Sequence, residues 1–159
     1  MKVERIDHMH IVVKDIEAAG RFFADIMGSH VFGPRDTGLG FKVAFDNLGI
    51  EFMAPTAPGN PIANRLDGYG EGLAWIGFKV PDLDEAVAEL REKGIKVTYW
   101  RDYSDPNWKG DVRAARTEDP TQTYGVAIEL VEYKDVQPVA AANWQKIGEI
   151  PLMPLGKKK

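Results

Sequence analysis

Two histidines and two glutamates stand at positions where they could do chemistry. His8 and His10 are two residues apart, so in a strand they point to the same side, roughly 7 Å apart. Glu51 and Glu129 each stand between apolar neighbours in short β-rich runs. A carboxylate there is costly to bury unless it meets a cation or a hydrogen-bond partner. Imidazoles and carboxylates that converge from different strands could bind a divalent ion such as Mg, Mn, Fe, Co, Ni or Zn.

Each of these residues also has a purely structural interpretation. A strand glutamate commonly lies on a solvated edge, and a strand histidine commonly has an ordinary hydrogen-bond partner. Glu51 and Glu129 hold equivalent places in two similar halves of the chain, which favours a joint metal site. His10 is also a candidate general acid–base group, because imidazole titrates near neutrality.

A duplication in the chain must position these side chains. Residues 6–27 and residues 73–93 share the order strand then helix, at an offset of 67 residues that aligns Asp15 with Asp82. Both aspartates stand where a helix N-cap belongs, and a glycine follows each helix as a C′ residue. The residues that mark these four helix ends are Asp15, Gly28, Asp82 and Gly94.

Short β-rich runs follow each helix, and a Pro- and Gly-rich stretch joins the two halves. The pattern predicts an α+β fold of two tandem βαβββ modules. These modules would form a curved mixed β-sheet cleft with the helices outside. The predicted parts are a first module over 4–55, a linker over 56–72, a second module over 73–133 and a C-terminal extension over 134–159.

Composition narrows the class of partner. The net charge is −4 and the pI is about 5.4, without the basic face that a nucleic-acid binder needs. The absence of cysteine excludes disulfides, thiolate nucleophiles and Cys-type zinc sites. Neither a membrane span nor a secretory signal is evident. We therefore expect a cytoplasmic protein that binds a small molecule, with no nucleic-acid or membrane partner.

Aromatic side chains gather in the second half, in and beside a long loop over residues 101–111. Core packing is one interpretation of them, and a wall or lid over a substrate is the other. The predicted substrate-binding residues are Trp75, Trp100, Tyr103 and Tyr124. Four basic residues nearby could meet a carboxylate or phosphate group, namely Arg101, Lys109, Arg113 and Arg116.

Several short motifs occur in an ordered series, namely Ile6-Asp7-His8, Val12-Val13-Lys14-Asp15, Glu51 to Pro55, Glu71-Gly72-Leu73 and Ile128-Glu129-Leu130-Val131-Glu132. In order and spacing they resemble the vicinal oxygen chelate superfamily. This superfamily contains glyoxalases, bleomycin-resistance proteins, extradiol dioxygenases and methylmalonyl-CoA epimerases. The likeness covers about residues 4–133 and is nearest to the epimerase-like members. Family habit and the C-terminal extension also favour a homodimer.

The resemblance implies a metal site with His8, Glu51 and Glu129 as ligands. Trp75 stands where the family has a second histidine, and an indole cannot ligate a metal. Three alternatives follow. His10 supplies the missing imidazole, or a three-ligand ion keeps an open position, or the metal is lost and Trp75 helps to build a binding pocket.

The resemblance also implies a reaction. We expect a metal-dependent isomerase, epimerase or lyase that acts on a small oxygenated substrate through an enolate-like intermediate, with Glu129 as a base. A second opposed base is in doubt, because Asp36 is the one candidate in its region and is poorly aligned. The alternative is a non-catalytic small-molecule binding protein of the drug-sequestering kind, with the same fold.

Overall fold

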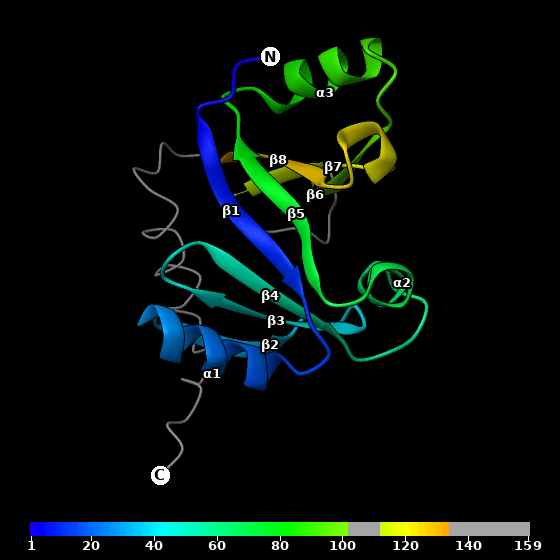
Figure 1. Cartoon of the computed structure of the whole chain (residues 1–159). Coiled ribbons are helices and arrows are strands. Elements are labelled where there is room, and N and C mark those ends of the chain that lie inside the picture. Colours follow the sequence, from blue (N-terminus) through cyan, green and yellow to red (C-terminus); the bar gives the residue numbers. More distant parts are fainter. Residues whose placement is uncertain (102–111, 134–159) are drawn as a thin grey trace. The chain divides into compact units, whose positions relative to one another are not determined.

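The computed structural model describes residues 1–101 and 112–133, and it has the predicted α+β character (Figure 1). The strands and helices follow the chain in the order of a doubled module. They are β1 (Arg5–Val12), α1 (Ile16–Met27), β2 (Val31–Asp36), β3 (Phe41–Asp46), β4 (Ile50–Pro55), α2 (Pro61–Tyr69), β5 (Gly72–Lys79), α3 (Leu83–Glu92), β6 (Val97–Arg101), β7 (Val112–Thr117), a 3₁₀ turn (Pro120–Thr123) and β8 (Ala127–Tyr133).

The described residues fall into two compact units. Unit 1 holds residues 1–8, 75–101 and 112–133, and unit 2 holds residues 9–74. The division passes through β1 and β5, so each of these strands contributes to both units. The start of β1 thus belongs to the same unit as residues of the second half.

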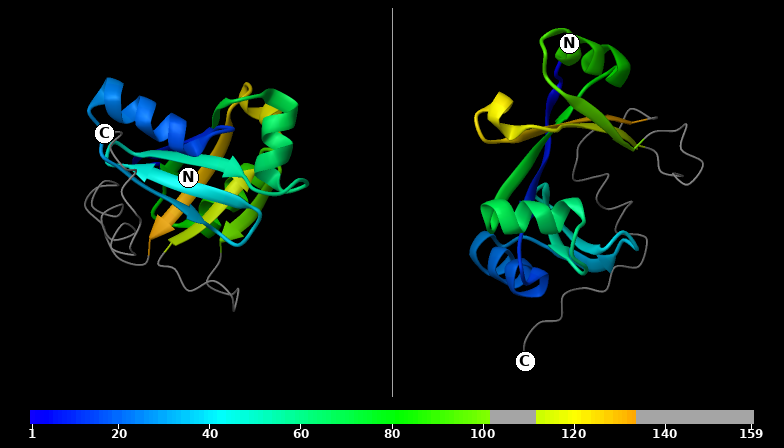
Figure 2. Two further views of the ribbon diagram at one scale, coloured as in Figure 1. Left: turned by 90° about the horizontal axis from the view of Figure 1, so that it is seen from below. Right: turned by 90° about the vertical axis from the view of Figure 1, so that its right-hand side faces the viewer.

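Unit 2 is a sheet covered by helix α1. The strand order is β2-β3-β4-β1, with β1 parallel to β4 and the remaining pairs antiparallel. Helix α1 packs on β2, β3 and β4, as the blue helix beside the cyan strands in Figure 2 shows. Val13, Ile16 and Phe52 lie in the core beneath it.

Unit 1 repeats this arrangement around α3. Its strand order is β1-β5-β8-β7-β6, and β5 is parallel to β8. Helix α3 packs on β6, β7 and β8. Leu130 and the partly buried Ile128 belong to this core, as the alternation in β8 predicts. Glu129, between them in the chain, therefore points to the other face of the strand.

The predicted helix ends are confirmed. The side chain of Asp15 accepts a hydrogen bond from the Ala18 amide, and Asp82 accepts one from the Glu85 amide. Gly28 and Gly94 both have positive φ angles, of 65° and 77°, which side chains disfavour.

The predicted linker contains a helix that the sequence pattern did not reveal. Asn60 caps α2 with its side-chain oxygen, which accepts hydrogen bonds from the amides of Ile62 and Ala63. Ile62 and Ala63 are buried, so the helix is anchored on unit 2. The surrounding Pro and Gly residues suggest a loop, but Pro61 at the first helical position is compatible with a helix start. Across the described residues, none of the helices is long and apolar enough to cross a membrane.

Candidate functional site

The imidazole of His8 lies buried between two carboxylates of unit 1. Its Nδ1 is 3.0 Å from Oδ2 of Asp7, and its Nε2 is 3.0 Å from Oε2 of Glu129. Asp7, His8 and Glu129 all have low exposure, at 4%, 7% and 3%. The ring can therefore hold a proton toward each carboxylate, or present Nε2 to a metal ion while Asp7 fixes Nδ1.

Gly77 makes room for this ring. A Cβ atom at position 77 would lie 2.8 Å from Cε1 and 2.9 Å from Nδ1 of His8, closer than real Cβ contacts come. The register of β5 and β8 pairs Gly77 with Glu129, so the imidazole reaches the carboxylate across a position without a side chain. The absence of a side chain at Gly77 thus positions His8.

Arg116 holds the other oxygen of Glu129. The register of β7 and β8 pairs these two residues, and Arg116 Nε donates to Oε1 of Glu129 at 2.7 Å. Both side chains are buried, with relative exposures of 10% and 4%. A buried carboxylate with a bound guanidinium on one oxygen stays ionised more readily, which leaves the second oxygen for His8, a metal ion or a proton.

Two indoles contact the guanidinium of Arg116. The Cζ atom lies 4.7 Å from the ring centroid of Trp75 and 4.3 Å from that of Trp100. Cation–π contacts of this kind are worth about 0.5–2 kcal/mol each, more where water is excluded. The structure therefore brings together two of the predicted substrate-binding aromatics, with an arginine between Glu129 and the rings.

Asp7 is the orienting residue of the cluster. Burial alone would raise the pKa of this carboxyl, but hydrogen bonds from His8 and Tyr133 outweigh it and lower the pKa below its usual range. The Tyr133 hydroxyl donates to Oδ2 at 2.5 Å, and Arg5 contributes an ion pair to Oδ1 at 3.3 Å. Asp7 is thus held as an anion at neutral pH.

Unit 2 contains a second imidazole–carboxylate pair. The parallel register of β1 and β4 places His10 opposite Glu51, and His10 Nδ1 lies 3.0 Å from Oε2 of Glu51. His10 is 1% exposed, whereas the Glu51 side chain is 13% exposed. The predicted ligand Glu51 therefore has a histidine partner within its own unit.

The donor set fits a divalent ion of hard or borderline character. Within unit 1, His8 and Glu129 are buried candidate metal ligands, with an imidazole nitrogen and a carboxylate oxygen facing each other. The contact between His8 and Asp7 is the carboxylate–imidazole support common behind metal-bound histidines.

The other predicted residues do not join this cluster. Tyr124 is fully exposed in a left-handed turn after the 3₁₀ segment, and Tyr103 lies outside the described residues. Asp36, the poorly aligned second base, accepts a hydrogen bond from the Gly38 amide in a turn of unit 2. Arg113 forms ion pairs with Asp84 and Glu132, so it is committed to supporting α3.

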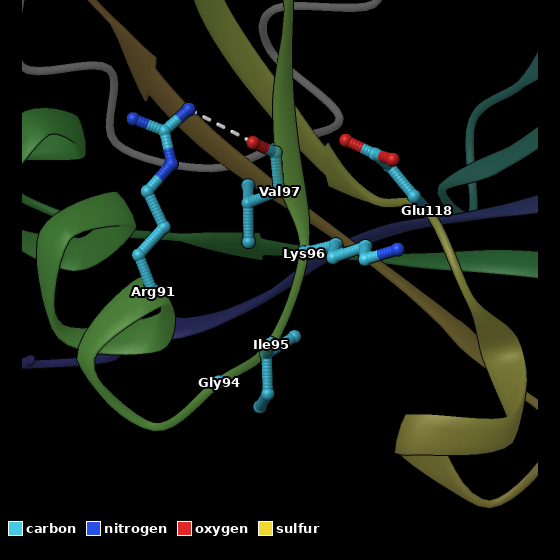
Figure 3. Close-up of a pocket in the computed structure, with 6 residues that line it drawn as sticks. All are labelled: Arg91, Gly94, Ile95, Lys96, Val97 and Glu118. Carbon is cyan, nitrogen blue, oxygen red and sulfur yellow. Dashed lines mark hydrogen bonds between the residues drawn. The ribbon is translucent and has the colours of Figure 1, made fainter.

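A separate surface hollow lies beside α3 and contains none of the predicted site residues. Its volume is about 340 Å³, and Figure 3 shows its lining of Arg91, Gly94, Ile95, Lys96, Val97 and Glu118. Arg91 is held to the Val97 carbonyl at 2.9 Å. Its lining offers no imidazole, and it carries no argument for catalysis.

The contacts of three participants were not predicted from the sequence. Asp7 was visible as a neighbour of His8, but its role depends on Tyr133, which is far away in the chain. Gly77 lies two residues after Trp75 in a predicted strand, and a glycine inside a strand often marks the close approach of another group. Arg116 was noted as a basic residue, but its pairing with Glu129 depends on the register of β7 and β8.

Comparison with known proteins gives a consistent family. The model described as Glyoxalase/Bleomycin resistance protein/Dioxygenase superfamily matches residues 7–115. The chain is 33% identical over 100 residues to the ethylmalonyl-CoA/methylmalonyl-CoA epimerase of Cereibacter sphaeroides. This match covers 60% of this chain and 75% of that protein. It is 31% identical over 98 residues to the mitochondrial methylmalonyl-CoA epimerase of Bos taurus, across 58% of this chain and 56% of that protein.

Solved structures agree with the sequence matches. A methylmalonyl-CoA epimerase in complex with methylmalonyl-CoA and NH4+ superposes with a TM-score of 0.69 at 26% identity, covering 86% of this chain and 99% of that one. The epimerase from Mycobacterium tuberculosis gives a TM-score of 0.66 at 28% identity, with coverage of 82% and 89%. The predicted resemblance is confirmed, and the chain belongs to the glyoxalase/bleomycin resistance protein/dioxygenase superfamily, in which its relatives include methylmalonyl-CoA epimerases.

Proposed function

We propose that this protein is a metal-dependent isomerase that epimerises an acyl-CoA thioester at the carbon next to the thioester carbonyl. The observation that carries the proposal is the buried Glu129 carboxylate, paired with Arg116 on one oxygen and facing His8 Nε2 with the other. The relatives named above, whose names specify methylmalonyl-CoA, supply the substrate class.

Glu129 is the proposed base. The hydrogen on a carbon between a carbonyl and a second acyl group is acidic enough for a carboxylate to remove when the resulting enolate is stabilised. The Glu129 carboxylate takes this proton and leaves a planar enolate. Inversion requires that a proton return to the opposite face of the enolate, and His10, the second proposed acid–base group, would donate it before both groups exchange protons with solvent. Arg116 keeps the carboxylate ionised before the transfer, and burial prevents water from competing for the proton.

The proposed metal ligands are His8, Glu51 and Glu129, with His10 as the fourth. A bound divalent ion would supply a Lewis acid for the developing negative charge on the substrate oxygen. Asp7 orients His8 by its contact at Nδ1, and Glu51 is paired with His10 at Nδ1. His10 at 1% exposure suits a fixed ligand, and its use as an acid–base group remains the second proposal for this side chain.

The function is tested by following the α-hydrogen of methylmalonyl-CoA in D2O by NMR. The metal-supplemented protein should exchange this hydrogen for deuterium, and a chelator should stop the exchange. Readdition of Mn, Co, Ni, Zn, Fe or Mg would then identify the ion that restores it. A protein that catalyses no exchange with any of these ions would contradict the isomerase proposal.

A further inference from the structure

Arg116 has hydrogen-bonding capacity that the folded chain leaves unused. A guanidinium has five N–H donors, and here the Nε donor is taken by Glu129. The terminal nitrogens Nη1 and Nη2 donate no hydrogen bond to the described residues, yet neither is fully sealed from solvent. The side chain is nine-tenths buried, so these donors have little freedom to move.

The surroundings of Arg116 restrict its movement. Glu129 holds Nε, and the indoles of Trp75 and Trp100 contact the guanidinium. An arginine confined in this way loses little further side-chain entropy when a ligand binds. Its remaining N–H edge matches the geometry of a carboxylate, which takes two parallel hydrogen bonds from a guanidinium.

We propose that Arg116 is a substrate-binding residue whose terminal nitrogens bind a carboxylate of the substrate. The substrate class is then an acyl thioester that carries a free carboxylate on the reacting carbon or beside it. This inference rests on the proposed function for its substrate, but the anion-binding property belongs to Arg116 itself. It also gives Trp75 a role, because the indole at the place of a second histidine helps to hold a guanidinium.

Arg113 offers a matched control on the same strand. It is three positions from Arg116 in β7, so the two side chains leave opposite faces of the strand. Arg113 is bound to Asp84 through both terminal nitrogens, at 3.1 and 2.7 Å. The substitution R113M therefore tests whether the loss of any arginine from β7 weakens carboxylate binding, or the loss of Arg116 in particular.

Binding of malonate to the full-length, chelator-treated protein tests the proposal by isothermal titration calorimetry, with malonamide as the uncharged control. Malonate should bind the wild-type chain and R113M alike, and malonamide should bind neither. Arg116→Met should lower malonate affinity by about tenfold or more, as expected for a lost charge-assisted hydrogen bond.

Arg116→Lys serves as the second variant if the methionine variant does not fold. Lysine keeps the charge but loses the planar fork, so it should fold and still bind malonate several-fold more weakly than the wild type. Equal malonate affinity in the wild type and the folded Arg116 variants would overturn the proposal, and so would the absence of malonate binding to the wild type. The two proposals can fail separately. If malonate binding depends on Arg116 but the protein does not exchange the α-hydrogen, this inference stands and the isomerase function is rejected.

Discussion

At the residue scale, the buried cluster of unit 1 is possible because each of its two carboxylates has an arginine partner and contacts the same imidazole. Asp7 has Arg5, Glu129 has Arg116, and the imidazole of His8 lies between the two carboxylates. A buried charge without a partner costs several kcal/mol, so loss of one member would destabilise the others. The ion pair with Arg116 favours the ionised form of Glu129, which is the form that can act as a base.

Substitution of Gly77 by alanine should disturb His8 most directly. The new Cβ would meet the imidazole at 2.8 Å, so the ring must shift, at a cost of about 1–3 kcal/mol in the free energy of unfolding. Urea denaturation measures this cost. Gly68→Ala is the control, because Gly68 lies inside α2 with no atom within 4 Å of an added Cβ, and alanine there should be neutral or stabilising. Equal effects of the two substitutions would refute the role assigned to Gly77.

Asp7 should make the stability of the protein depend on acid pH. Its folded-state pKa is lowered from 3.8, so ionised Asp7 stabilises the fold at neutral pH. That contribution is lost as the pH falls below 3.8 through the folded-state pKa. The free energy of unfolding, measured by urea between pH 7 and pH 3, should therefore fall less steeply in Asp7→Asn than in the wild type. Parallel curves for the two proteins would contradict this assignment.

At the element scale, local sequence signals were sufficient to predict α1 and α3, the capped helices of the two halves. Asp15 and Asp82 act within one turn of chain, so their function can be recognised without tertiary structure. Helix α2 was missed because its cap and its buried residues sit among Pro and Gly, which favour loops in the absence of tertiary contacts. The Arg116–Glu129 pair was missed because a cross-strand register is not a local property.

The cap of α2 provides a test at this scale. Asn60→Ala removes the acceptor for two amides and the donor to the Gly40 carbonyl, and should cost about 1–2 kcal/mol of unfolding free energy. Asn64→Ala, at an exposed position of the same helix, should change stability by no more than about 0.5 kcal/mol. Chemical denaturation of both variants measures the two free energies of unfolding. An unchanged free energy of unfolding in Asn60→Ala would show that α2 does not depend on this cap.

At the scale of the whole molecule, the duplication was readable because the same pattern recurs at a fixed offset. The superfamily and the α+β fold followed from that order and are confirmed by the comparisons. The modules over 4–55 and 73–133 remain a prediction, and β1 and β5 each contribute to two compact units. The homodimer and the cytoplasmic location remain predictions.

Metal binding should appear as a gain in thermal stability of the full chain. An ion present at a hundred times its dissociation constant stabilises the folded state by about 2.7 kcal/mol. Addition of the activating ion to chelator-treated protein should therefore raise the Tm, and Glu51→Gln should reduce the shift. Glu118→Gln, in the separate hollow of Figure 3, should leave it unchanged. A Tm that no divalent ion alters would contradict the metal site.

The central claim is that the buried carboxylate of Glu129 moves the substrate proton. It is tested most directly by the rate of α-hydrogen exchange of methylmalonyl-CoA in D2O for Glu129→Gln, with Glu118→Gln as the matched control. A general base contributes about 10²–10⁴-fold to such a step. We predict that Glu129→Gln, folded by circular dichroism, loses at least about a hundredfold in rate while the control keeps the wild-type rate. A folded Glu129→Gln protein that exchanges the hydrogen at the wild-type rate would contradict the account.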